Sequence, residues 1–336
     1  MGIETYRVKL KLLGPVHIGS GMTLRKKDYI YDFHNSEVHF INGPKLMNYL
    51  KSLNLLDKYY DFLQYSQGRN SKESDLKYFF EKNNIKKSDW PRFVDFKEHF
   101  NQGKRNSRMK SKPLNDLHLM VRDGQNQVYI PGSSLKGAIK TALLGINDNS
   151  SDKDLYNKLR VSDSLPISTD CLAIYEKIDI NKVDKPMPLY RECIEVGTEI
   201  NMEISIVDKA FDINHIEAAI RSFYENYNNK WLLGFNHSRI GRQVLSESES
   251  PHQNILYLGG GTGFASKTLH YQHKNKLQAK QDMMKILKKR FRNTYGKMRH
   301  TPENVPIVLK ATYNQALDSW YQQGMCEVSF EKINEV

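Results

Sequence analysis

Near the N-terminus, apolar and cationic residues alternate with a period of two. The apolar positions are Tyr6, Val8, Leu10 and Leu12, and the cationic positions between them are Arg7, Lys9 and Lys11. This alternation is typical of a β-strand that buries one face and leaves the other to water or to an anionic partner. A strand of this kind has to lie in a sheet whose buried face is covered by a second layer.

Further strands and helices follow in an irregular order. A hairpin is expected at Tyr29–Phe33 and Val38–Ile41, and a helix at Pro44. Gln127–Ile130 is expected to be a strand that turns into a helix at Leu135–Leu144, with Ser133 or Ser134 as the N-cap. The later expected strands are Arg160–Asp163, Leu189–Val196, Glu199–Val207, Ile255–Leu258 and one that carries Cys326, Val328 and Phe330. The later expected helices have apolar faces at Ile213, Ile216, Ile220, Phe223 and Tyr227, and at Met284, Leu287, Phe291, Tyr295 and Met298. Hairpins mixed with helices favour an α+β fold with antiparallel sheets over one doubly wound parallel sheet.

The length of 336 residues exceeds what one compact core usually holds, so two units are expected. The polar stretch Asn147–Asp154 divides them, which gives units at 1–148 and 149–336. Residues 52–125 are expected to be a largely helical insertion in the first unit. The insertion ends with a basic run at Lys104–Lys112, which we expect to be a solvated loop.

The charge of the chain points to a polyanionic partner. Fifty Lys and Arg residues against 38 Asp and Glu residues give a net charge of +12, which favours association with a polyanion through counterion release. No apolar run approaches the roughly 20 residues of a membrane span, so no membrane partner is expected. The three cysteines form no CxxC pair, which fits a reducing cytoplasm. His270 and His273 have no nearby residues to complete a metal site, so neither a metal nor a cofactor is expected.

Three glycine-rich turns, at residues 14–21, 131–134 and 259–263, are the candidate binding elements. Glycine allows backbone to approach a phosphate closely, and free N–H groups at the start of a helix favour an anion. The predicted phosphate-binding residues are His17, Gly19, Ser20, Gly21, Arg25, Lys26, Lys27, Gly132, Ser133, Ser134, Lys136, Lys140, Gly259, Gly260, Gly261, Gly263 and Lys267. For any one of these turns, the alternative is that glycine merely makes a tight bend.

Two enzymatic alternatives remain open at this point. Gly261–Thr268 is a near match to the P-loop of nucleotide hydrolases, but Ser266 stands where that motif has its second glycine. No later apolar strand ends in an Asp that could hold magnesium. A ribonuclease could use His17 or Asp28 as a general base, although neither has an evident catalytic partner.

The same segments resemble a known family. Gly14–Gly21 is similar to the opening of RAMP proteins of CRISPR systems, and Val128–Gly137 resembles their most recognisable segment. Leu258–Lys267 resembles the glycine-rich loop found late in that superfamily, and Val161-Ser162-Asp163 and the Leu189–Val207 hairpin extend the match. The length and the basic C-terminal helix are most similar to a subunit of type III-A (Csm) effector complexes.

This resemblance implies two ferredoxin-like (RRM-like) units and a non-catalytic role in binding guide RNA (crRNA) by its phosphates. It implies a place at the 3′ side of the crRNA, capping the filament of backbone subunits, and a part in crRNA maturation during antiviral defence. The implied partners are the crRNA, the other Csm subunits, especially the backbone RAMP subunit, and host ribonucleases. The family's backbone subunits cleave target RNA with an Asp after the first strand. Asp28 lies in a comparable region without a clear motif match, so this role is not carried over. Ordinary RRM aromatic motifs are absent, which argues against base stacking on the sheet.

Overall fold

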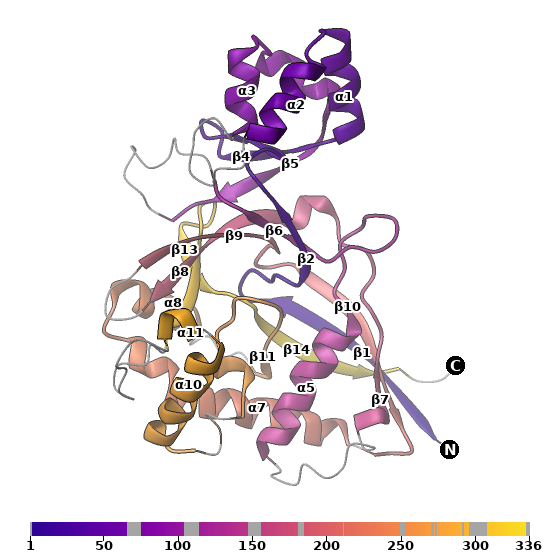
Figure 1. Ribbon diagram of the computed structural model, residues 1–336. Helices are drawn as coiled ribbons and strands as arrows, with labels where there is room; N and C mark the ends of the chain where they lie inside the picture. The colour runs from indigo at the N-terminus through magenta and orange to yellow at the C-terminus, as the bar shows by residue number, and fades with distance from the viewer. Residues whose placement is uncertain are drawn as a thin grey trace.

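A five-stranded antiparallel sheet forms the centre of the lower part of the protein in Figure 1. The computed structural model describes residues 2–65, 75–103, 114–146, 156–180, 185–210, 212–248, 253–269, 272, 274–290, 292–295 and 308–333. The order of the strands is β11 (Ile255–Tyr257), β14 (Met325–Lys332), β1 (Ile3–Leu12), β10 (Glu199–Val207) and β7 (Leu159–Val161). In the central ladder, Val8 lies opposite Met202 of β10 and Phe330 of β14. The predicted N-terminal strand is confirmed, and it pairs with the last strand of the chain.

The buried face of this sheet is covered by two helices, α5 (Gly132–Ile146) and α7 (Ile213–Lys230). The apolar side chains predicted for β1 enter this core, as do Leu135, Ile139 and Ile220 from the helices. The cationic side chains of β1 are exposed, but two of them are paired. Arg7 lies 3.5 Å from Glu331 and Lys9 lies 2.8 Å from Glu199, so neighbouring strands partly neutralise the basic face.

The second sheet is larger and mixed. Its strands run in the order β2 (Gly19–Leu24), β6 (Leu117–Met120), β9 (Lys185–Ile194), β8 (Leu172–Ile180), β5 (Val94–Asn101), β4 (Glu37–Ile41) and β3 (Tyr29–Asp32). Two further strands, β12 (Leu309–Asn314) and β13 (Ser319–Gln322), join it through the pairing of β12 with β8. β5 pairs with β8, and β6 with β9, in parallel. The fold is therefore α+β as predicted, but the expectation of wholly antiparallel sheets was wrong because two strands of the insertion add in parallel.

The insertion forms a helical lobe at the upper end of Figure 1, beyond β4 and β5. It contains α1 (Gly43–Ser52), α2 (Leu56–Tyr65), α3 (Leu76–Lys82) and the 3-10 helix η2 (Lys87–Arg92). A separate core supports the lobe, with Leu50, Phe80 and Phe93 fully buried. The largely helical character expected for residues 52–125 holds for α2 and α3, but β5 and β6 also lie within this range. The basic run at 104–112 lies outside the described residues.

The remaining helical elements are η3 (Thr169–Cys171), η4 (Leu232–Phe235), α8 (Arg239–Ser248), η5 (Ala265–Lys267), α10 (Lys276–Arg290) and α11 (Arg292–Tyr295). Of the inward positions expected for the long basic helix, Met284 and Leu287 are half-buried against a core, while Phe291 and Met298 lie outside the described residues. The strand expected at Gln127–Ile130 was wrong, because Val128 forms only isolated bridges with Arg122 and Ile167. Within the described part of the chain, no helix is both long and apolar enough to cross a bilayer.

The expected boundary near residue 148 lies outside the described residues. Strands from both sides of it meet in the five-stranded sheet, since β1 is bonded to β10 and β14. The division into two units at this boundary stays a prediction.

Candidate RNA-binding site

The first and third glycine-rich turns are in direct contact. The N–H of Gly260 donates a hydrogen bond to the carbonyl oxygen of His17, with an N···O distance of 2.6 Å. Gly259 has a φ of +73°, and a Cβ at this position would overlap the same oxygen. Glycine is required at 259 by the left-handed backbone and by the close approach of another chain segment. The group that approaches Gly259 is protein backbone, whereas the prediction from the sequence was that a phosphate approaches this turn.

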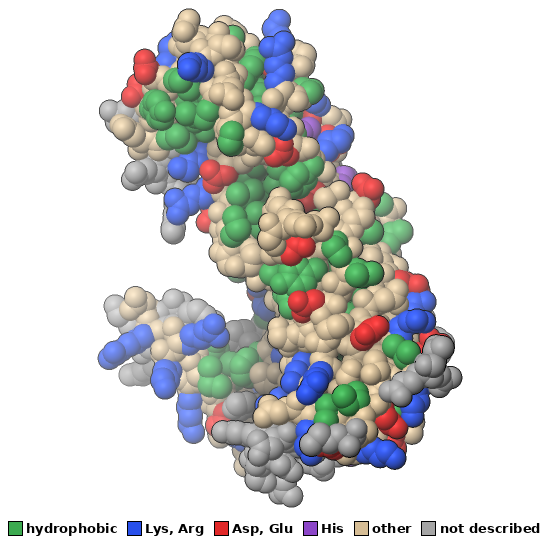
Figure 2. All heavy atoms as spheres, turned by 90° about the vertical axis from the view of Figure 1, so that its right-hand side faces the viewer, with side chains coloured by type: hydrophobic (Ala, Val, Ile, Leu, Met, Phe, Trp, Pro, Cys, Tyr) green, Lys and Arg blue, Asp and Glu red, His purple; other side chains and the backbone are tan. Residues whose placement is uncertain are grey.

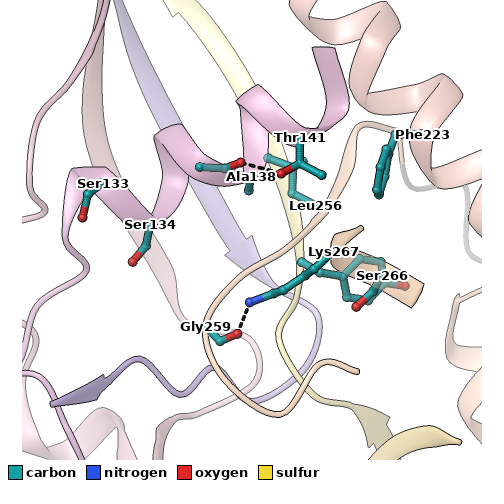
Figure 3. Close-up of a pocket in the computed structure, with 11 residues that line it drawn as sticks. Ser133, Ser134, Ala138, Thr141, Phe223, Leu256, Gly259, Ser266 and Lys267 are labelled. Atoms are coloured by element: carbon teal, nitrogen blue, oxygen red, sulfur yellow. Dashed lines mark hydrogen bonds between the residues drawn. The ribbon is translucent and has the colours of Figure 1, made fainter. Parts of the chain in front are cut away.

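The second and third turns line a common pocket of about 300 Å³. Figure 3 shows Ser133 and Ser134 on the first turn of α5, facing the same space as Gly259 and Lys267. The full lining is Ser133, Ser134, Gly137, Ala138 and Thr141 of α5, Phe223 of α7, and Leu256, Tyr257, Gly259, Ser266 and Lys267. The third turn therefore contacts the first turn and shares a pocket with the second, so the three predicted elements lie near one another.

Not every predicted residue lies at this meeting point. β2 begins at Gly19, next to the His17 ring, and carries Ser20 and Gly21 away from it along the exposed edge of the larger sheet. Arg25, Lys26 and Lys27 follow β2, and the N–H of Leu76 in the helical lobe donates to the Lys26 carbonyl at 3.1 Å. The six residues of β2 span about 20 Å at the usual rise of a strand, so these three cations are near the insertion. Lys136 and Lys140 lie on α5 but do not line the pocket, and Lys140 lies 4.8 Å from the ring centre of Tyr156.

The start of α5 differs from the prediction. The helix begins at Gly132, so Ser133 and Ser134 lie inside its first turn and neither is the N-cap. The Gly132 N–H instead donates to the carboxylate of Asp163 at 2.7 Å, and a Cβ at Gly132 would overlap the Val161 carbonyl oxygen. The first free N–H of the helix is therefore occupied by a protein carboxylate. The side chains of the first turn reach the pocket. The Gly132 N–H is not available to a phosphate, contrary to the prediction for the start of this helix.

His17 is buried, and its Nδ1 donates a hydrogen bond to the Glu192 carbonyl oxygen at 2.7 Å. Burial lowers the pKa of His17 to about 4, so the imidazole is neutral at physiological pH and is a poor acceptor of a full proton. Asp28 lies at the far end of β2, where its carboxylate accepts the N–H of Arg25 at 2.8 Å. The two candidate catalytic groups are thus separated by the length of β2.

Lys267 ends η5, and its ammonium group donates to the Gly259 carbonyl oxygen. Although the residue is exposed, partial desolvation of its ammonium group lowers the pKa of Lys267 to about 8. Thr268, the next residue, has extended backbone dihedral angles, so no α-helix begins at the position where a P-loop requires one. The resemblance of this segment to a P-loop therefore does not extend to its geometry, and the nucleotide hydrolase alternative loses its support.

Comparison of the sequence with known protein families identifies the family of this chain. The model of the RAMP superfamily matches residues 9–264, which include all three glycine-rich turns and most of the chain. The chain belongs to the RAMP superfamily.

Individual relatives make this assignment more specific. The chain is 45% identical to the CRISPR system Cms protein Csm5 of Enterococcus italicus and 28% identical to the protein of the same name from Streptococcus thermophilus, over 99% of both chains in each case. Its fold is similar to a chain in the cryo-EM structure of a Csm-crRNA-target RNA ternary complex of a type III-A CRISPR-Cas system. That match has a TM-score of 0.70 at 20% identity and covers 96% of this chain and 100% of the other. The crystal structure of T. onnurineus Csm5 matches with a TM-score of 0.62 at 18% identity, covering 95% and 99%. The resemblance of this sequence to RAMP proteins, and among them to a Csm subunit, is confirmed.

Sequence reasoning missed one cation of this RAMP protein beside the third turn. Arg191 of β9 is half-buried, and a Cβ at Gly261 would lie 2.8 Å from its Nη1. Glu192 is its sequence neighbour, but adjacent strand residues point to opposite faces, and Glu192 pairs with Arg122 instead. The available signal was an arginine in a predicted strand of mostly apolar residues. The adjacent glutamate offered a local ion-pair partner for it, so the arginine did not stand out.

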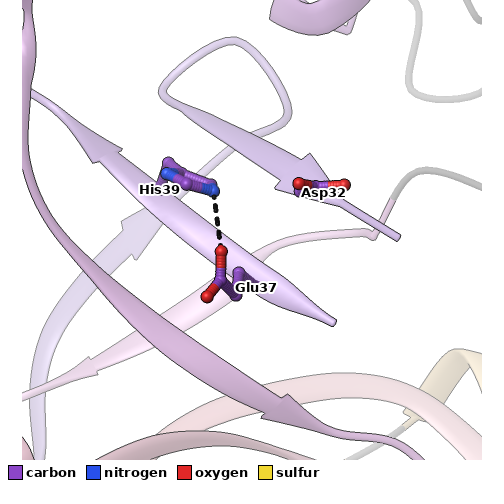
Figure 4. Close-up of side chains that lie close together, drawn as sticks. All are labelled: Asp32, Glu37 and His39. Carbon is purple, nitrogen blue, oxygen red and sulfur yellow. Dashed lines mark ion pairs between the residues drawn. The ribbon is translucent and has the colours of Figure 1, made fainter. Parts of the chain in front are cut away.

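A second polar cluster of the RAMP fold lies at the hairpin of β3 and β4, away from the glycine turns. Figure 4 shows Asp32, Glu37 and His39, whose possible ligand atoms lie within 4.8 Å of one another. Both carboxylates form ion pairs with lysines: Asp32 pairs with Lys87 of η2, and Glu37 lies 2.6 Å from the ammonium group of Lys97 of β5. These ion pairs tie the hairpin to the neighbouring elements and account for the cluster without an ion. The expectation that the chain binds no metal stays a prediction.

The surface view in Figure 2 shows a hollow in the outline of the protein below the helical lobe. Lys and Arg side chains gather on the projecting part that bounds this hollow from below. Some of the Lys and Arg side chains of this basic chain therefore lie beside a concave surface, an arrangement that attracts polyanions.

Proposed function

We propose that this RAMP protein is a non-catalytic crRNA-binding subunit of a type III-A Csm complex. The observation that carries the proposal is the meeting of the three glycine-rich turns, through the Gly260–His17 hydrogen bond and the shared pocket. Lys267 and Arg191 supply positive charge at this point, and phosphate contacts position a nucleic acid without reading its sequence. The similarity to a chain of a complex that contains crRNA and target RNA supports the choice of ligand.

The finer parts of the proposal concern the place of the protein in the assembly. It caps the filament at the 3′ side of the crRNA, contacts the backbone RAMP subunit and other Csm subunits, and supports crRNA maturation by helping host ribonucleases in the cytoplasm. The two sheets are the cores of two ferredoxin-like units. Joining a reconstituted Csm complex is a direct test of this placement, because a protein that binds crRNA but never enters the particle is not a capping subunit.

The RNA-binding part is tested by charge reversal on α5. Lys136→Glu with Lys140→Glu is expected to weaken binding to the same extent for guides of unrelated sequence. It is also expected to make the dependence of log Kd on log salt shallower, by about one unit for each phosphate that the protein no longer neutralises. The matched control is Lys51→Glu with Lys58→Glu, two exposed lysines of the helical lobe that give the same change in net charge. A weakening confined to one guide sequence, or an equal weakening in the control, would count against a phosphate site at α5.

Catalysis is tested separately. Purified protein incubated with crRNA precursor, with and without magnesium, is expected to leave it intact. Cleavage that disappears in His17→Ala would overturn the non-catalytic part of the proposal, because no contaminating nuclease would respond to that substitution.

A further inference from the structure

One edge of the His17 ring lies between two glycines. A Cβ at Gly19 would lie 3.0 Å from His17 Nε2, and a Cβ at Gly260 would lie 3.3 Å from His17 Cδ2. Any other residue at position 19 would therefore place a side chain against Nε2. Among the hydrogen bonds between described residues, the His17 ring takes part in one, through Nδ1.

The hydrogen bond on the other side of the ring fixes the chemistry of this edge. Because Nδ1 donates to the Glu192 carbonyl, it carries the proton of the neutral imidazole, and Nε2 is left with a lone pair. The low pKa of His17, about 4, which results from burial, keeps the ring in this neutral form. Nε2 can therefore only accept a hydrogen bond. A phosphate oxygen cannot supply one, because it is itself an acceptor.

Arg191 lies next to this edge. Gly261 follows Gly260 directly, so the glycine against Arg191 adjoins the glycine against His17. The guanidinium of Arg191 makes one long contact, 3.5 Å from Nη1 to Gln323 Oε1, and no carboxylate of the described residues pairs with it. Burial lowers the pKa of Arg191, and the nearby charge of Asp179 offsets this effect only in part. A planar guanidinium with unused N–H donors is suited to a phosphate.

We propose that His17 and Arg191 form a seat for a single ribose-phosphate unit of RNA, in which the guanidinium binds the phosphate and Nε2 accepts a hydrogen bond from the ribose 2′-hydroxyl. The 2′-hydroxyl is the only hydrogen-bond donor in the RNA backbone, and DNA lacks it. The seat therefore distinguishes RNA from DNA without reading a base. This inference rests on the proposed function, to which it adds the chemical group that is recognised.

The test uses the full-length wild-type chain and a set of guides that each carry one 2′-deoxynucleotide. One position is expected to bind about 2- to 12-fold more weakly, as for the loss of one hydrogen bond, and the other positions are expected to bind like the unmodified guide. Gly19→Ala leaves the Nδ1 hydrogen bond in place and sets a methyl group against Nε2, so the penalty at that position is expected to disappear. The control is Gly43→Ala, where an added Cβ meets nothing within 4 Å and the penalty is expected to remain.

The phosphate half of the seat has its own measurement. Arg191→Gln is expected to make the salt dependence of binding shallower by about one unit for every guide, and Arg191→Lys, which keeps the charge, is expected to retain the steeper dependence. If wild-type protein binds no RNA, the proposed function itself fails. If it binds RNA but no deoxy position is penalised, or Arg191→Gln leaves the salt dependence unchanged, the seat is wrong and the proposed function stands.

Discussion

The N–H of Gly260 and the carbonyl oxygen of His17 lie 2.6 Å apart, and this hydrogen bond joins the loop after the first strand to the loop after β11. The two loops are far apart in the sequence, and at Gly259 in the loop after β11 the carbonyl oxygen of His17 leaves no room for a side chain. Part of the glycine content of these turns thus serves to lock two loops together. This hydrogen bond holds in place the turn that lies beside Arg191 and accepts a hydrogen bond from Lys267, so we expect its loss to weaken the proposed binding of RNA.

The first prediction concerns this lock. In Gly259→Ala, the new Cβ would meet the His17 carbonyl oxygen while the backbone stays at a positive φ, which costs roughly 1–2 kcal/mol for the backbone alone. We expect a fall of at least about 2 kcal/mol in the free energy of unfolding, together with weaker RNA binding. Chemical denaturation with a fluorescence readout measures the first effect. Gly234→Ala, where an added Cβ meets nothing within 4 Å, is the control and is expected to change neither quantity appreciably.

The second prediction tests whether Asp163 or Ser133 caps the N-terminus of α5. Asp163→Ala removes the acceptor of the Gly132 N–H and should lower the free energy of unfolding by about 1 kcal/mol, as for other N-cap substitutions. Ser133→Ala should leave it nearly unchanged, because Ser133 is exposed inside the first turn. Thermal unfolding of the two variants in parallel decides the matter. The reverse ranking would mean that the serine is the true cap.

The elements predicted best from the sequence are those that bury one face and expose the other. β10 was predicted with its observed bounds because its buried and exposed residues alternate along its length. β8 was missed because most of its side chains are buried whichever face they point to, which removes the period of two on which a prediction depends. It is buried because β5, β9 and β12 all pair with it, and no local pattern contains that information.

The loops that form the candidate site could be predicted from the sequence, but the positions of their groups relative to one another could not. The three glycine turns were identified, and the structure brings them together. The cap of α5 was assigned wrongly because Asp163 lies 31 residues after Gly132, beyond the reach of a local capping rule. Arg191 was overlooked because only the fold shows that Glu192 pairs with Arg122 and leaves the arginine beside Gly261.

The third prediction uses the lowered pKa of Lys267, which is about 8 because its ammonium group is partly desolvated. The ammonium form exists below this pH, so its contribution to phosphate binding should disappear between about pH 7 and 9. We expect wild-type protein to bind RNA more tightly than Lys267→Met at pH 7 and equally at pH 9.5, measured at constant ionic strength. A difference between the two proteins that persists at pH 9.5 would mean that the lysine charge is not what binds.

The same pKa fixes the sign of an effect on stability. Since the unfolded lysine titrates near 10.4, the unfolded chain binds more protons than the folded chain between about pH 8 and 10.4. Rising pH in this window therefore stabilises the fold through Lys267. Tighter folding and weaker RNA binding on going from pH 8 to 10 would be two consequences of one deprotonation. Lys267→Met should show smaller changes in both, because Lys310, whose pKa burial also lowers to about 8, still titrates in this window.

The fourth prediction concerns a buried group of charges beneath the larger sheet. Glu192 is fully buried, pairs with Arg122, and accepts the N–H of Met120 at 2.6 Å. Glu98 is buried next to it, and burial together with the negative charge of Glu192 holds the pKa of Glu98 well above its ordinary value. The two glutamates therefore differ in environment: Glu192 has the guanidinium of Arg122 as its counter-ion, whereas Glu98 keeps its proton to a higher pH than an exposed glutamate.

This difference predicts opposite results for two equivalent substitutions. Glu192→Gln leaves Arg122 in a largely buried site without its counter-ion and should cost about 3–5 kcal/mol of unfolding free energy. Glu98→Gln imitates the protonated form and should be tolerated. In wild-type protein, the folded state binds more protons than the unfolded state above the unfolded glutamate pKa of about 4.3, so the contribution of Glu98 to stability declines as the pH rises. Unfolding free energies from pH 5 to 8 should therefore fall less steeply for Glu98→Gln than for wild type. Equal slopes, or a larger destabilisation by Glu98→Gln than by Glu192→Gln, would show that the charge assignment of the pair is the reverse.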